Sequence, residues 1–160
     1  MEKKRCKWAS DVPEIYVKYH DEEWGVPCHD DHHLFEMLIL EGFQAGLSWL
    51  TILKKREAFR EAFDHFDATI IKDYDEDKIK TLMQNKAIVR NKRKIEAAKI
   101  NANVFIQIQK EFGSFDAYLW HFTDNKVVYD HDEPIPTSTP LSDEISNDLK
   151  KRGMKFVGTT

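Results

Sequence analysis

One nine-residue run, Glu41-Gly-Phe-Gln-Ala-Gly-Leu-Ser-Trp49, joins a lone carboxylate to two glycines and a large aromatic ring. We expect Gly46 to end one helix and Ser48 to cap the next. This arrangement leaves Leu47 at an exposed corner and turns Trp49 back toward the core. A carboxylate, an apolar wedge and an aromatic plate therefore converge at one helix junction, which is typical of a binding or catalytic site.

The position of the acid on its helix bears on its role. Leu34, Met37, Leu38 and Glu41 recur at helical spacing within residues 31–43, so the carboxylate is predicted on or beside the stripe that faces the interior. A buried carboxylate persists only if it is paired, hydrogen-bonded or used in chemistry. Two interpretations stay open: a structural acid held by an arginine or a backbone donor, and a functional acid.

The elements that must position this run are short helices, because no stretch alternates apolar and polar residues for long enough to form a sheet. The expected fold class is all-α. Asp11 is the expected cap of the first helix, and the third helix should carry Lys54, Lys55 and Arg56 on a solvated face. Residues 123–140 are predicted as a loop. Helices are predicted over residues 13–23, 31–43, 48–63, 75–84, 92–112, 115–122 and 142–153.

Composition narrows the class of protein. The 160 residues correspond to about one domain, predicted over 1–160, and a net charge of −4 argues mildly against indiscriminate nucleic-acid binding. No apolar run approaches membrane-spanning length and no signal peptide is recognisable, so we expect a cytoplasmic protein without membrane contact. Two cysteines cannot build a disulfide framework.

One segment differs in charge from the rest of the chain. Six basic residues stand against the single acid Glu96 in residues 86–99: Lys86, Arg90, Lys92, Arg93, Lys94 and Lys99. A helix ending near Asn85, a connection of about six residues and a new helix near Asn91 would point cations and backbone N–H groups outward together, as phosphate binding requires. The alternative is an ordinary helix connection with solvated lysines.

Two sets of residues could bind metal. Cys28-His-Asp-Asp-His-His33 would suit a metal-dependent hydrolase, but its acids are expected to cap a helix and its adjacent histidines to face different ways. Cys6 and His20 are a second possibility. Two ligands fall short of the four that a structural zinc site normally has, so a core cysteine and a capping histidine are the expected alternative.

Seven blocks of sequence together resemble the bacterial 3-methyladenine DNA glycosylase I family. The blocks are Cys6-x-Trp8, Tyr16-x-x-Tyr19-His20-Asp-x-x-Trp24-Gly-Val-Pro27, Leu34-Phe-Glu-Met37, Leu40-Glu-Gly42, Gln44-Ala-Gly-Leu-Ser-Trp49, Leu53-Lys-Lys-Arg-Glu57 and Lys155-Phe-Val-Gly-Thr-Thr160. The match runs essentially end to end. It implies a divergent all-helical member of the helix-hairpin-helix glycosylase superfamily, whose substrate is double-stranded DNA with alkylated bases.

The resemblance implies a base pocket. Glu41 is similar to the acidic residue of that pocket, and Trp49 to the aromatic on which a flipped base stacks. The other walls would come from aromatic residues near the N-terminus: Tyr16, Tyr19 and either Trp8 or Trp24. For Trp24, a position in the core is the expected role.

The resemblance also implies contacts with the duplex. Gln44 and Leu47 are similar to the residues that enter the space left by the flipped base. The hairpin, near 75–112 with its flanking helices, would contact the DNA backbone through four basic side chains: Lys86, Arg90, Lys92 and Arg93. Its connection, Lys86-Ala-Ile-Val-Arg-Asn91, lacks the glycines usual in the superfamily.

Family members continue beyond Thr160 with a further helix and a His and a Cys, which join the counterparts of Cys6 and His20 around a structural zinc ion. This chain ends before them, so we expect a form that lacks the C-terminal segment and exposes apolar surface. The two remaining ligands should bind zinc weakly.

The implied activity is excision of 3-methyladenine by base flipping and hydrolysis of the N-glycosidic bond, in base excision repair. No lysine nucleophile lies in the matched pocket, so the enzyme is expected to be monofunctional, and we expect a monomer. The alternatives are a non-catalytic or inactive truncated helical DNA-binding protein and the metal-dependent hydrolase.

Overall fold

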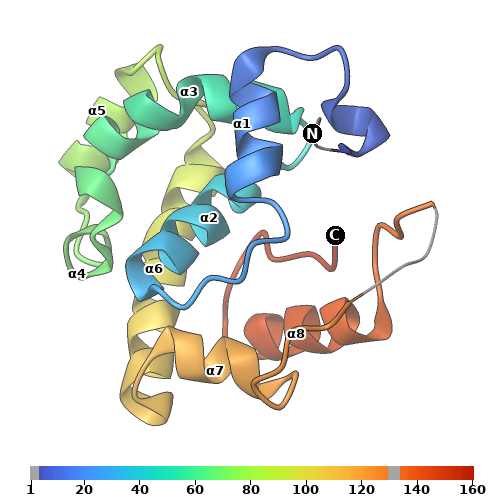
Figure 1. Ribbon diagram of the computed structural model, residues 1–160. Coiled ribbons are helices and arrows are strands. Elements are labelled where there is room, and N and C mark those ends of the chain that lie inside the picture. Colours follow the sequence, from blue (N-terminus) through green and yellow to red (C-terminus); the bar gives the residue numbers. More distant parts are fainter. Residues whose placement is uncertain (1–3, 130–133) are drawn as a thin grey trace.

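The computed structural model describes residues 4–129 and 134–160, and within these ranges it contains helices and no strands (Figure 1). This confirms the all-α prediction. The α-helices are α1 (Glu14–Glu22), α2 (Asp31–Gln44), α3 (Trp49–Ala62), α4 (Ala68–Ile71), α5 (Glu76–Gln84), α6 (Lys92–Phe112), α7 (Phe115–His121) and α8 (Pro140–Lys151), with 3-10 turns η1 (Lys7–Ala9) and η2 (Asp64–Phe66). No helix in these ranges is both long and apolar enough to cross a bilayer.

Most of the α-helices begin at a side-chain N-cap, but two predictions about helix beginnings are wrong. Asp11 does not cap α1, because its backbone is left-handed (φ 57°) and Pro13 stands at the N-cap. Helix α8 begins before Ser142, because Thr139 and Ser142 form a reciprocal capping box around Pro140. The predicted loop 123–140 contains turns and irregular backbone over 123–129 and 134–139, its last residue Pro140 belongs to α8, and residues 130–133 lie outside the described part of the chain.

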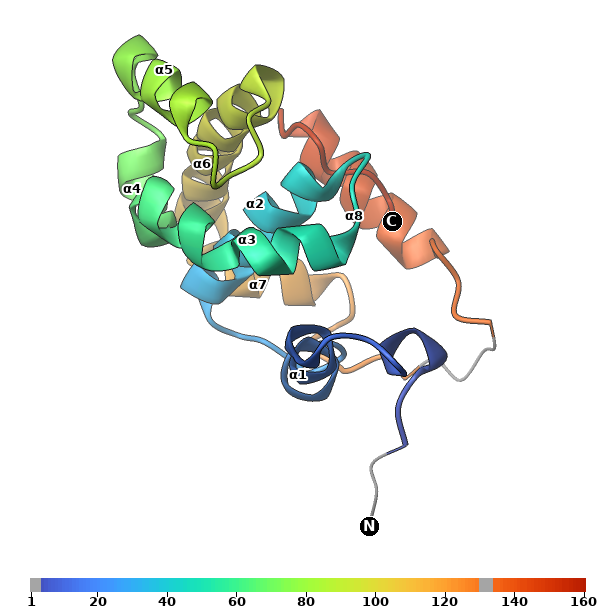
Figure 2. The same cartoon turned by 90° about the horizontal axis from the view of Figure 1, so that it is seen from above.

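The core forms where α2 packs against α6, the longest helix, which α4, α5 and α7 also contact (Figures 1 and 2). Phe35 of α2 lies 4.8 Å from Phe105 of α6 between ring centroids, and Ile39 and Ile95 are buried in the same cluster. Helix α2 therefore buries its Phe35 and Ile39 face against α6. Its other face is free to form part of a site.

A buried ion network joins the residue that follows α1 to α2 and α3. Glu36 is only 4% exposed and accepts hydrogen bonds from Arg56 Nε at 3.0 Å and Arg60 Nε at 2.6 Å, while Arg56 also pairs with Glu23 at 2.8 Å. Burial alone would raise the pKa of Glu36, but the bonds from Arg60 and Arg56 lower it overall. The prediction that Arg56 lies on a solvated face is therefore wrong.

Candidate active site

An open pocket of about 690 Å³ lies between α2, α7, α8 and the segment that follows α8. Leu34 and Met37 line it from α2, Leu119 from α7, and Ile145 from α8, so its walls are mostly apolar. Its volume falls within the range of about 300–1,000 Å³ that small-molecule sites occupy. This volume exceeds that of a flat heterocycle the size of a purine.

The stripe that contains Glu41 lines this pocket, and its apolar members also pack against the core. Leu34, Met37 and Leu38 are partly buried there, whereas Glu41 is exposed toward the pocket. The predicted orientation is therefore only partly right: the three apolar residues pack against the core at the pocket wall, while the opposite face of α2, with Phe35 and Ile39, is the fully buried one. The spacing nevertheless placed the acid and its apolar neighbours on one surface.

The Glu41 carboxylate makes no hydrogen bond or ion pair with any described residue. It can touch solvent through the pocket mouth, but the protein around it displaces most bulk water. This desolvation raises the pKa of Glu41 to about 7. The structural interpretation, an acid held by arginine or a backbone donor, gains no support, and the group remains available to a ligand.

The predicted aromatic walls form one cluster beside the pocket. Ring centroids are 5.2 Å apart for Trp8 and Tyr16, 6.4 Å for Tyr16 and Tyr19, and 5.4 Å for Tyr19 and Trp49. Burial and the nearby Glu41 carboxylate raise the pKa of Tyr19, so this ring connects the cluster to the acid. The rings are not among the residues that line the 690 Å³ pocket, whereas Glu41 is.

Two tryptophans of the cluster differ in burial. Trp24 packs edge-on against Trp8 at 5.2 Å and is 38% exposed, so the expected core position is wrong. Trp49 is buried, and its indole Nε1 has no hydrogen-bond partner among the described residues. Such an unsatisfied buried donor is uncommon in proteins.

The connection between α2 and α3 presents the predicted wedge. Gly46 is left-handed (φ 78°), Ser48 caps α3 by accepting from the Thr51 amide at 3.2 Å, and Leu47 is 40% exposed at the pocket rim, as predicted. Gln44 also lines the pocket.

One predicted cation has a different role. Lys94 is 7% exposed, and its Nζ donates to the carbonyls of Phe43 at 2.9 Å and Ala45 at 2.5 Å. It therefore holds the carbonyl end of α2, where a positive charge also complements the helix dipole. Lys94 does not belong to the exposed basic surface, and instead ties α6 to the wedge.

The hairpin lies between α5 and α6, close to its predicted position. Asn85 and Asn91 accept hydrogen bonds from the amides of Ala87 and Lys94, at 3.0 and 3.2 Å, which shapes the connection and caps α6. Four of the predicted basic side chains are exposed on it: Lys86, Arg90, Lys92 and Arg93.

Neither candidate metal set is complete among the described residues, where no group of three or more potential ligands occurs. In residues 28–33, His29 Nδ1 lies 2.7 Å from Asp116 and His32 Nε2 lies 2.6 Å from the His65 carbonyl, so the side chains have separate partners. The hydrolase alternative therefore has no geometric support.

Cys6 and His20 do lie together, because the Cys6 amide donates to His20 Nε2 at 3.3 Å. His20 Nδ1 faces Asp21 at 2.9 Å, the kind of contact that orients metal-binding imidazoles. Two ligands do not by themselves fit a four-coordinate structural zinc site.

Comparison with known proteins identifies the family of the chain. The methyladenine glycosylase family model matches residues 8–160. The chain is 45% identical over 159 residues to DNA-3-methyladenine glycosylase 1 of Escherichia coli strain K12, covering 98% of this chain and 84% of that protein. It is 42% identical over 160 residues to DNA-3-methyladenine glycosylase of Haemophilus influenzae, covering 98% and 85%.

Solved structures give the same result. A crystal structure of 3-methyladenine DNA glycosylase I is similar with a TM-score of 0.89 and 46% identity, covering 98% of this chain and 87% of that one. A variant of 3-methyladenine DNA glycosylase I in complex with 3-methyladenine has a TM-score of 0.89 and 37% identity, covering 96% and 84%.

Proposed function

The chain belongs to the methyladenine glycosylase family and is a DNA-3-methyladenine glycosylase, and we propose that it excises the base in the pocket that Glu41 lines. The observation that carries this assignment is the unpaired Glu41 carboxylate, desolvated at the edge of an apolar pocket. The closeness of Tyr19 to that carboxylate supports it.

Cleavage of the N-glycosidic bond requires little catalytic assistance from the protein. Methylation at N3 leaves adenine close to cationic, so the N-glycosidic bond is already weak. When it breaks, its electron pair leaves with the base and makes the base neutral, water adds to the anomeric carbon of the sugar as a hydroxyl group, and the remaining proton of that water passes to solvent. Glu41 accepts a hydrogen bond from the exocyclic amino group and favours the positive charge of base and sugar, as preorganised electrostatic catalysis does.

The base must first leave the duplex. Extrusion costs least for a damaged base with impaired stacking and pairing, and it delivers the base to Glu41 and to the Tyr19 and Trp49 rings. Leu47 and Gln44, at the rim of the same pocket, occupy the space in the duplex. Lys94 acts as a positioning residue, because it fixes the carbonyls from which the wedge departs.

The decisive assay is release of free 3-methyladenine from alkylated duplex DNA by this chain. We expect the free base and an abasic site as products, with undamaged duplex as the control. Because no lysine nucleophile is assigned, borohydride should trap no covalent adduct. Duplex binding without base release would instead favour the non-catalytic DNA-binding alternative.

We also propose that the zinc ligands of this chain are Cys6 and His20, and that the metal is structural. A pair of ligands holds zinc far more weakly than four do. Purified chain dialysed against metal-free buffer should therefore contain well under one zinc ion per molecule, measured by elemental analysis. One tightly held ion that is lost in Cys6→Ser would contradict weak binding.

A further inference from the structure

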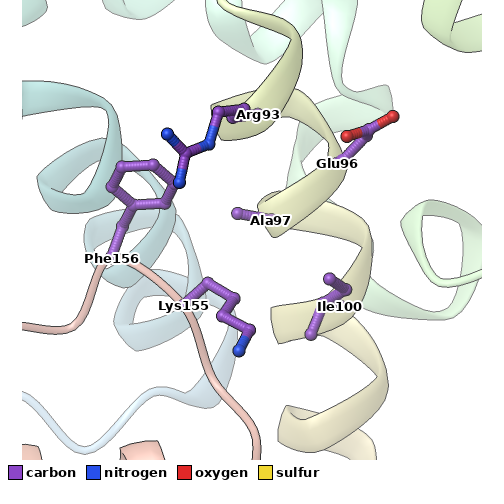
Figure 3. Close-up of a pocket in the computed structure, with 6 residues that line it drawn as sticks. All are labelled: Arg93, Glu96, Ala97, Ile100, Lys155 and Phe156. Atoms are coloured by element: carbon purple, nitrogen blue, oxygen red, sulfur yellow. The ribbon is translucent and has the colours of Figure 1, made fainter.

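A second hollow, separate from the Glu41 pocket, lies between α6 and the segment that follows α8. It measures about 380 Å³ and is lined by Arg93, Glu96, Ala97, Ile100, Lys155 and Phe156 (Figure 3). We call it the α6 groove. Of these residues only Arg93 belongs to the predicted DNA-contacting set, so the groove extends that surface across a new part of the molecule.

The α6 groove is cationic. Arg93 stands on one wall and Lys155 on the other, and neither side chain has an ion pair among the described residues. The only acid, Glu96, points away from Phe156 in Figure 3, and its carboxylate lies 3.7 Å from Lys92 Nζ. Two uncompensated positive charges that flank an open groove favour an anionic ligand.

The wall that carries Lys155 is fixed in place. Asn101 of α6 is 3% exposed, and its amide group donates to the Lys155 carbonyl at 2.9 Å and accepts from the Lys155 N–H at 2.8 Å. Ser146 of α8, also buried, donates to the Val157 carbonyl at 2.6 Å. Two buried polar side chains therefore fasten residues 155–157 to two helices.

Phe156, between these attachments, has a left-handed backbone (φ 56°), which is strained for a bulky residue and persists only where the surroundings impose it. It lines both the α6 groove and the Glu41 pocket. It also lies against α2, since a Cβ atom on Gly42 would approach Phe156 Cβ to 3.6 Å. The groove therefore begins at the hairpin side of α6 and ends where the pocket begins.

We propose that Arg93 and Lys155 form a second phosphate-binding site, which holds the backbone of the DNA strand that carries the damaged base. The proposal rests on the proposed function, because the strand must pass from the hairpin to the pocket mouth. Arg93 and Lys155 bind its phosphates, and Phe156 separates that backbone from the extruded base. A groove that binds phosphates adds affinity without reading sequence.

The test is the salt dependence of binding to a duplex that contains one stable abasic-site analogue. Lys155→Gln should reduce the slope of log affinity against log salt by about one unit, and Arg93→Gln by about one more. Lys155→Arg should restore the slope. Lys151→Gln removes an exposed lysine at the end of α8, outside both hollows, and should leave the slope unchanged.

Binding of free 3-methyladenine, measured by calorimetry, separates this proposal from the function itself. We expect it to be the same in wild type and Lys155→Gln, because the free base carries no phosphate. Equal salt slopes for wild type and Lys155→Gln would overturn the groove proposal. Failure of the wild type to bind the free base would count against the pocket assignment instead.

Discussion

Glu41→Gln is expected to lower the rate of 3-methyladenine release by about 10²- to 10³-fold, the usual cost of removing one preorganised electrostatic group from an active site. Glutamine keeps the shape and a hydrogen-bond acceptor but loses the negative charge that faces the developing cation. Affinity for duplex DNA should change little, because the residues assigned to phosphate contacts lie on the hairpin and in the α6 groove and not at Glu41. Single-turnover release from alkylated duplex measures the effect, and an unchanged rate would remove Glu41 from the mechanism.

The pH dependence provides an independent check on the same residue. Since the pKa of Glu41 is about 7, kcat/KM should rise with pH through about 7 as the carboxylate ionises, and this rise should be absent in Glu41→Gln. Glu61→Gln is a matched control, because it neutralises an exposed acid of α3 away from the pocket. Its rate and pH profile should equal those of the wild type.

As pH rises, the contribution of Glu41 to the stability of the folded protein should fall while the activity rises, because both depend on ionisation of Glu41. The folded-state pKa of about 7 exceeds the ordinary value of 4.5, so between these values the folded protein holds the proton more tightly than the unfolded chain. The contribution of Glu41 to the free energy of unfolding is therefore highest at low pH, where Glu41 is protonated in both states, and it falls as pH rises through about 7. Glu41→Gln should melt above the wild type at pH 8, with the difference shrinking toward pH 5, which also excludes misfolding as the cause of lost activity.

Helix α2 illustrates what the sequence could and could not predict. Its limits, its caps and the grouping of Glu41 with Leu34 and Leu38 follow from local spacing. Both faces of α2 are apolar, however, since Phe35 and Ile39 form a second stripe. Periodicity cannot choose between two such stripes, and the choice was made by the packing of α6 against Phe35.

Two charged residues also show that local sequence patterns cannot reveal contacts between distant parts of the chain. Arg56 and Lys94 look solvated in the sequence because their partners are distant along the chain: Glu36 lies 20 residues before Arg56, and the Ala45 carbonyl 49 residues before Lys94. The α6 groove was missed for this reason, because the hydrogen bonds that hold Lys155 against α6 come from Asn101, 54 residues earlier in the chain. The short elements η1, η2 and α4 contain three or four residues each, too few to show a period.

Reversing the charge of Arg90 and Lys92 together should weaken binding to every duplex, damaged or not, because these exposed side chains of the hairpin are assigned to phosphates and not to bases. The slope of log affinity against log salt should fall by about two units, one for each lost contact. Reversal of Lys110 and Lys126, two exposed lysines away from the hairpin, makes the same change in net charge and should leave that slope intact.

Comparing DNA affinity with the rate of base release at saturating DNA tests whether the hairpin only binds DNA and the Glu41 pocket only performs the chemistry. At DNA concentrations that saturate the Arg90→Glu/Lys92→Glu variant, base release should return to nearly the wild-type rate, since Glu41 and its pocket are unchanged. Glu41→Gln should show the reverse pattern, with normal affinity and a slow rate at saturation. A salt slope that stays at the wild-type value in the double variant would mean that other residues hold the phosphates. A rate of base release that stays low at saturating DNA would mean that the hairpin also positions the base.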